Sequence, residues 1–127
     1  MKQAHIFALG LICGAILTGI LLNAQQPEMD PVKISPQLYK VRLENDKVRV
    51  LEYHLKPGGK EPMHSHSSGI VYILTEARMR VTNPDGSKSE ATGKAGDVLW
   101  REPVAHSIEN IGSTEAHAIA VELKACK

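Results

Sequence analysis

The sequence has no excess of charge of either sign. Lysine and arginine number 15 against 14 aspartates and glutamates, so the formal net charge is +1. A surface with this balance has no field that would gather nucleic-acid phosphates or anionic lipid. We therefore expect no nucleic-acid partner.

Cysteine is almost absent. The chain contains only Cys13 and Cys126, and Cys13 lies inside an apolar run close to the N-terminus. Without that run a single thiol remains, and one thiol cannot close an internal disulfide. The folded part must therefore be stabilised by its core.

Three common catalytic patterns are missing as well. The sequence has no Gly-x-Ser-x-Gly nucleophile motif, no glycine-rich phosphate loop and no carboxylate pairing of the kind that glycosidases use. If the protein is an enzyme, its chemistry belongs to a metal.

Residues 1–24 have the pattern of an export signal. Lys2 precedes an uncharged apolar run from Ile6 to Leu22, and polar, acidic sequence follows at once. The run is intermediate between a signal peptide and a spanning helix of about 20 residues, so cleavage after Ala24 and retention as a signal anchor both stay open. The flanking charges place the folded part outside the cytoplasm in either case. We expect a periplasmic or secreted protein, attached to the inner membrane only through an uncleaved leader.

The rest of the chain divides into a linker and one all-β domain. Residues 25–37 contain three prolines and are predicted as the linker, and residues 38–127 as the domain. Turn residues, most clearly Asn83-Pro84-Asp85-Gly86, separate short stretches rich in β-branched side chains. We predict an antiparallel sandwich or small barrel behind an apolar leader helix. The predicted strands are 38–43, 48–55, 70–74, 78–82, 88–92, 97–101, 106–110 and 117–124.

Three histidines are the candidate metal ligands. His64 and His66 are two residues apart, so an extended chain presents them on one face. His106 opens a predicted strand after a turn-like segment and is the candidate third donor. Imidazole is the usual nitrogen ligand of zinc, iron, nickel, copper and manganese in proteins. His54 and His117 have no partner nearby in sequence and are interpreted as structural or surface residues, with metal ligation as the minor alternative.

The sequence around these histidines resembles the cupin family. The resemblance extends from about residue 41 to residue 124 and implies a double-stranded β-helix of the cupin or jelly-roll type. Where the family has its glutamate ligand, this chain has Ile70 or Gly69, and the segment before His106 is shorter than in the family. The positions that match the two family motifs are Gly58 or Gly59, His64, His66, Gly96, Asp97, Pro103, His106 and Asn110.

The resemblance leaves two classes of function open. Three neutral imidazoles would leave a divalent ion (iron, zinc, nickel or manganese) with its full charge and with open coordination positions. Some cupin-like thiol and diketone dioxygenases use such a site, so one hypothesis is a metal-dependent dioxygenase or isomerase acting on a small organic molecule. The alternative is a non-catalytic module of the cell envelope that binds a small ligand or serves as an accessory.

Two further residues and one strand have candidate roles. Tyr72 alternates with Ile70 and Leu74; if this side faces the interior, its phenol is a candidate proton donor, and otherwise it is an ordinary core tyrosine. Glu102 is either a substitute carboxylate ligand or a solvated loop residue. The strand predicted over residues 38–43 is an exposed edge. We expect two copies of the chain to pair through it as a homodimer.

Overall fold

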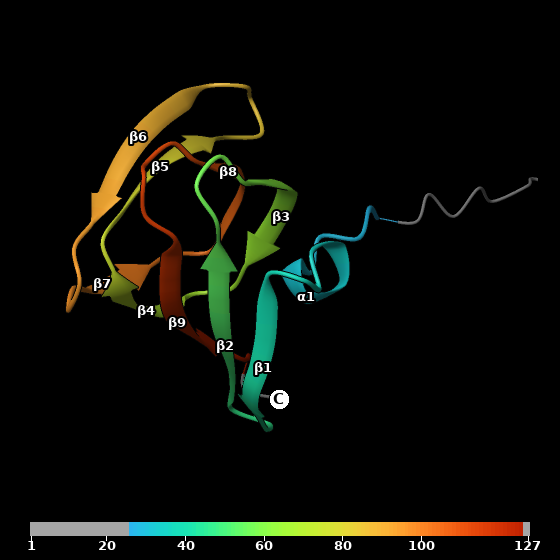
Figure 1. Ribbon diagram of the computed structural model, residues 1–127. Helices are drawn as coiled ribbons and strands as arrows, with labels where there is room; N and C mark the ends of the chain where they lie inside the picture. The colour runs from blue at the N-terminus through green and yellow to red at the C-terminus, as the bar shows by residue number, and fades with distance from the viewer. Residues whose placement is uncertain (1–25, 126–127) are drawn as a thin grey trace, which may run out of the picture.

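The structure, a computed structural model, describes residues 26–125. They form nine strands and one short helix, and every strand pairing among them is antiparallel (Figure 1). One sheet has the order β1-β2-β9-β4-β7 and the other the order β3-β8-β5-β6. The elements are α1 (Pro31–Ile34), β1 (Tyr39–Glu44), β2 (Val48–Leu55), β3 (Lys60–His66), β4 (Gly69–Thr75), β5 (Ala77–Thr82), β6 (Lys88–Gly93), β7 (Val98–Arg101), β8 (Val104–Asn110) and β9 (Ala116–Leu123).

The two-sheet, all-β prediction is confirmed for these residues. Eight of the strands lie within one or two residues of the predicted bounds, and the hairpin at Asn83-Pro84-Asp85-Gly86 is present, with Thr82 opposite Lys88. Gly86 adopts a φ of 84°, which glycine tolerates because it has no Cβ. The predicted leader helix lies outside the described residues. Within residues 26–125, no helix combines the length and the apolarity that crossing a membrane requires.

Strand β3 is not among the predicted strands. It pairs with β8, with Glu61 opposite Ile108 and His64 opposite His106, so β3 has one residue more than β8 between these two pairs. This register shift is a β-bulge, and Pro62, which has no backbone N–H for a ladder, lies within it. Pro62 and the preceding glycines are turn signals, and the bulge interrupts the alternation of inward and outward side chains. A prediction based on that alternation therefore does not find this strand.

Helix α1 lies inside the predicted linker. Asp30 caps it, because its Oδ1 accepts the Val32 N–H at 3.0 Å, and Pro31 occupies the first turn, where no N–H is needed. Asp30 also pairs with Arg49 of β2 at 2.9 Å, and the Met29 carbonyl accepts the Ser65 N–H of β3 at 2.8 Å. These contacts attach residues 29 and 30 to both sheets, and Figure 1 shows α1 beside β1 and β3.

A cavity of about 280 Å³ lies between the sheets. Strand β9 lines it with small side chains, since Ala116, Ala118 and Ala120 alternate along its buried face. An alanine face leaves room that larger residues would fill. The fold therefore forms a lined internal space as well as a core.

Candidate metal centre

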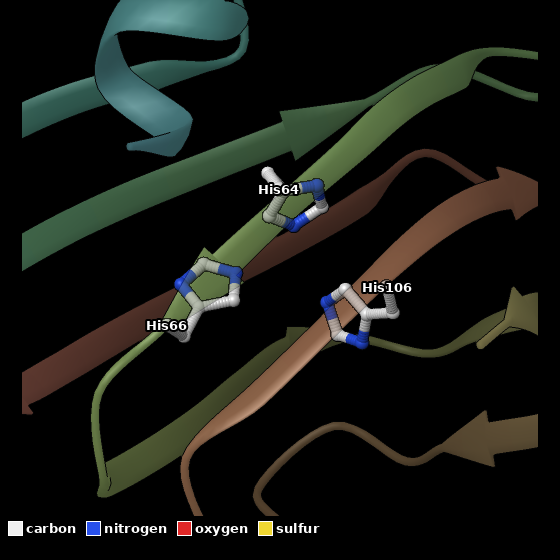
Figure 2. A group of neighbouring side chains, drawn as sticks. All are labelled: His64, His66 and His106. Carbon is white, nitrogen blue, oxygen red and sulfur yellow. The ribbon is translucent and has the colours of Figure 1, made fainter. Parts of the chain in front are cut away.

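The structure brings His64, His66 and His106 together. His64 and His66 share the inner face of β3, and His106 lies directly opposite His64 on β8. One ring nitrogen from each histidine lies within 4.8 Å of the other two. Figure 2 shows the three rings turned toward a common space. His64 is completely buried and His66 is 8% exposed, so this space is shielded from bulk water.

Hydrogen bonds fix the orientation of two of these rings. The Nδ1–H of His64 donates to the Pro62 carbonyl at 2.8 Å, because a carbonyl only accepts. His66 Nδ1 lies 2.6 Å from the Glu122 carboxylate, which requires the proton on that nitrogen. Each Nε2 is then left with a free lone pair. The Nε2 of His64 is buried and has no hydrogen-bond partner among the described residues.

Burial keeps all three imidazoles neutral. It lowers the pKa of His64 to about 4, with the hydrogen bond to Pro62 opposing the shift. It lowers the pKa of His106 to about 3, and the other two histidines lower it further. The pKa of His66 is also lowered by burial, against the opposing effect of Glu122. Neutral imidazoles near pH 7 are the form that binds a metal ion.

Glu122 is a buried carboxylate that the sequence analysis missed. It lies on β9, 3% exposed, and pairs with Arg49 at 2.8 Å and Arg101 at 3.3 Å as well as with His66. Burial alone would raise its pKa, but the hydrogen bonds from His66 and Arg49 outweigh burial and the pKa is lowered. Glu122 is therefore an anion that orients His66 from behind.

Glu61 is a second missed carboxylate. Unlike Glu122, it pairs with no arginine or lysine among the described residues. It is 2% exposed and lines the cavity, and neither of its oxygens has a hydrogen-bond partner among the described residues. Its Oε1 lies 3.4 Å from His64 Nδ1. Burial raises the pKa of Glu61 to about 7, although the nearby hydroxyls of Tyr39 and Tyr53 hold the shift down.

The cavity has a polar end and an apolar body. Tyr39, Tyr53, Glu61 and Arg101 surround the histidines at the polar end. Apolar side chains from both sheets line most of the remainder, among them Val71, Ile73, Met79, Val81, Leu99 and Ile108. A mostly apolar cavity with a few convergent polar groups is typical of a small-molecule site.

Tyr72 lies away from this cavity. Val71 and Ile73 line it, so the alternating Tyr72 points to the outer face of β4, where it is 43% exposed. Neither role considered from the sequence, a proton donor near the metal or an ordinary core tyrosine, fits this position. Glu102 also lies outside, exposed, and its Oε1 accepts the Trp100 indole N–H at 2.6 Å.

The two positions that replace the family's glutamate offer no ligand. Ile70 points outward and is 42% exposed. A Cβ on Gly69 would lie 1.9 Å from the Val121 carbonyl oxygen, so no side chain fits there. Asn110, which matches the second motif, is structural: its Nδ2 donates to the carbonyls of Leu55 and Thr114, both at 2.8 Å.

Comparisons with known proteins identify the fold. No protein-family model matches the chain, and a search of curated proteins finds no match. Among solved structures, the chain is similar to a cupin domain from Bordetella pertussis Tohama I, with a TM-score of 0.64 and 25% identity, over 79% of this chain and 99% of that one. It is also similar to an RmlC-like cupin family protein from Methanocaldococcus jannaschii, with a TM-score of 0.54 and 18% identity, over 68% of this chain and 78% of that one.

A third similar structure is an uncharacterised conserved protein with a double-stranded β-helix domain from Klebsiella pneumoniae, with a TM-score of 0.54 and 20% identity, over 68% of this chain and 75% of that one. These matches agree with the sheet order and with the resemblance seen in the sequence motifs. Residues 26–125 thus form a domain with the double-stranded β-helix fold of the cupin superfamily.

Proposed function

We propose that the protein binds one divalent metal ion through His64, His66 and His106. Two observations carry the proposal: one ring nitrogen of each histidine lies within 4.8 Å of the other two, and the Nε2 of His64 is buried without a hydrogen-bond partner among the described residues. A buried polar atom without a partner is unfavourable by about 1–3 kcal/mol. Coordination of a metal by three neutral imidazoles would remove that penalty.

The residues around the triad suit this role. Glu122 holds the Nδ1 proton of His66, and the Pro62 carbonyl holds that of His64. Such outer hydrogen bonds fix the ring orientation and raise the basicity of the coordinating nitrogen. When bound, the ion supplies Lewis-acid or dioxygen-binding chemistry, and iron, zinc, nickel and manganese all suit imidazole ligands.

We further propose that the ligand is a small organic molecule with an apolar body and one anionic group. The volume of about 280 Å³ sets the size, and the apolar walls favour a hydrocarbon portion. Arg101 lines the polar end and is the cation that an anionic group would meet. The Glu61 carboxyl is the proton carrier of the site, because a carboxyl with a pKa of about 7 holds or releases a proton near neutrality.

This arrangement supports a dioxygenase or isomerase as the first candidate. The second candidate is a module that binds such a ligand without turnover. Most residues that line the cavity are apolar, and apolar side chains contribute affinity for a ligand but no chemistry. This lining favours the binding module. The buried proton carrier beside the triad favours the first.

Metal analysis tests the proposed site. Untagged protein dialysed against metal-free buffer should retain about one equivalent of metal at the triad. A His64→Ala, His106→Ala variant should contain one equivalent less than wild type, whereas a Tyr72→Phe variant, changed on the outer face of β4, should keep the wild-type content. Circular dichroism checks that the variants fold. A double variant that folds and retains the same metal content would remove the proposal.

Oxygen uptake separates the two functions. Iron-loaded protein is incubated with thiols, diketones and phenolic acids, and oxygen consumption is recorded. Uptake that disappears in the His64→Ala, His106→Ala variant would support the dioxygenase. Binding of a panel member without uptake or isomerisation would support the binding module.

Export is a further proposal, and it rests on the sequence alone. Residues 1–24 lie outside the described residues, so its support is the charge and apolar pattern of the leader. Fractionation of cells that produce the full chain should find the domain outside the cytoplasm. Recovery in the cytoplasmic fraction would contradict export without affecting the metal site.

A further inference from the structure

A second group of histidine and carboxylate side chains lies on the outer face of the β1-β2-β9-β4-β7 sheet. His54 of β2 and His117 of β9 occupy directly opposite positions in the ladder. The two strands are neighbours in the sheet (Figure 1). Their rings stack with centroids 4.0 Å apart. Glu52 precedes His54 by two residues and so shares its face of β2. None of the three side chains takes part in the histidine triad of the cavity.

The ligand atoms of this group lie within 4.8 Å of one another. The Oε1 of Glu52 lies 2.9 Å from His117 Nε2 and 3.5 Å from His54 Nε2. In a tetrahedral zinc site with bonds of about 2.0–2.1 Å, neighbouring donor atoms are about 3.4 Å apart. The observed separations bracket that value, and the two rings, now stacked at an interplanar angle of 22°, would turn about their side-chain bonds to point both lone pairs at the ion.

One proton must leave before the group can bind an ion: His117 Nε2–H donates to Glu52 Oε1, and a metal ion would displace that proton. His54 Nδ1 lies 2.8 Å from the Glu115 carboxylate, which holds a proton on Nδ1 and leaves the lone pair on Nε2. This carboxylate–histidine pair is the arrangement that supports a metal-bound imidazole. Arg42 binds the other oxygen of Glu52, Oε2, and so neutralises part of its charge without occupying Oε1.

We propose that Glu52, His54 and His117 form a second metal site, outside the cavity, that takes Zn²⁺ or a similar borderline divalent ion. Two imidazoles and a carboxylate are a zinc ligand set that leaves one position for water. That position faces solvent, since the His54 side chain is 44% exposed. The ion would join β2 to β9 across the ladder. This site is independent of the triad, and either can fail alone.

Zinc titration calorimetry tests the proposal. Zinc should bind the chelator-treated full chain in two classes of site. A His54→Asn, His117→Asn variant should lose one class and keep the other, and a His64→Ala, His106→Ala variant should show the reverse. Circular dichroism checks that both double variants fold.

The conservative variant Glu115→Gln provides a second measurement that does not depend on the double variants folding. It should weaken zinc at the outer site by about tenfold or more, because it removes the carboxylate behind His54. Arg42→Ala is the matched control and should not weaken binding, since Arg42 contacts only the oxygen turned away from the site. Identical zinc binding in wild type, Glu115→Gln and the His54→Asn, His117→Asn variant would overturn the proposal.

Discussion

At the residue scale, the chain of contacts behind His66 links the triad to the stability of the fold. Glu122 accepts from His66 and also pairs with Arg49 and Arg101, whose side chains are less than one-fifth exposed. One carboxylate therefore orients a metal-binding histidine and balances the charges of two largely buried arginines. A change at Glu122 must affect both properties.

The Glu122→Gln substitution separates this role from simple packing. It preserves the shape but removes the charge, so metal binding should weaken about 10-fold or more. The metal-free protein should also lose about 3 kcal/mol of stability, because Arg49 and Arg101 lose a buried counter-charge. Calorimetry and urea unfolding measure the two effects. Glu90→Gln, an exposed partner of Arg78, is the control and should resemble wild type. Unchanged metal affinity in Glu122→Gln would contradict the orienting role.

Glu61 gives the folding of the metal-free protein a pH dependence with a definite sign. Its pKa is about 7 in the folded state against an ordinary value of 4.5, so the folded state binds its proton more tightly. The stability that this proton contributes is complete below pH 4.5 and is lost as the pH rises through 7. A Glu61→Gln variant has no ionisable group at this position, so its stability does not fall for this reason.

Urea unfolding of the wild type and the Glu61→Gln variant, in the presence of a chelator, measures this difference from about pH 5 to about pH 8. The variant should gain stability relative to wild type across the interval and level off above it. Glu90→Gln should show no such trend there, because Arg78 lowers the pKa of Glu90 and moves its titration below the interval. A constant difference between wild type and Glu61→Gln would mean that Glu61 is not protonated by burial.

These residues also mark the limit of sequence prediction at the site. The three histidines were predicted because alternation places His64 and His66 on one face and the second motif supplies His106. Strict alternation puts Glu61 on the opposite face from His64, and only the bulge at Pro62 brings it inward. The inward position of Glu122 could have been predicted from the sequence, since Glu122 continues the inward alternation of Ala116, Ala118 and Ala120.

At the element scale, the pairing of β3 with β8 explains why two distant motifs act together. Gly58 donates its N–H to the Asn110 carbonyl at 2.8 Å, and Asn110 donates its own to the Gly59 carbonyl at 3.0 Å. Further along the same ladder, His64 lies opposite His106. The glycines and Asn110 therefore set the register that aligns the histidines.

Helix α1 shows what local sequence alone does not reveal. Four residues are too few for a helical period, so the segment with three prolines predicts only a linker. Tertiary contacts decide the outcome, because the capping residue Asp30 also binds Arg49, which in turn binds Glu122. The helix is thus connected to the carboxylate that orients His66.

Two substitutions at Asp30 distinguish its capping role from its ion pair. Asp30→Asn keeps an oxygen for the Val32 N–H but loses the charge that faces Arg49, whereas Asp30→Ala loses both. Asp30→Ala should therefore be the more destabilising, with about 1 kcal/mol from the cap alone. Urea unfolding makes the comparison. Glu28→Gln, which removes only an exposed pair with Lys33, is the control. Equal stability of Asp30→Ala and wild type would show that α1 is not held by this residue.

At the scale of the whole molecule, the four strands that end the two sheets are β1, β7, β3 and β6. Strand β1 ends the β1-β2-β9-β4-β7 sheet and exposes Val41 at 40% and Leu43 at 48%. The unpaired backbone groups of an edge strand are a template for another strand. Antiparallel pairing of two copies centred on Arg42 would set Lys40 opposite Glu44 and Val41 opposite Leu43. Both pairs are complementary, one in charge and the other in apolar contact.

This register leads to the expectation that the protein is a two-fold symmetric dimer joined through β1. A Val41→Lys substitution would place a charge in the apolar pair, so light scattering should give the mass of one chain for this variant and of two chains for wild type. Val98→Lys is the matched control, because Val98 is 65% exposed on β7 at the opposite end of the same sheet. The dimer should survive that change. A monomeric wild type, or a dimer dissociated by Val98→Lys and not by Val41→Lys, would exclude β1 as the interface.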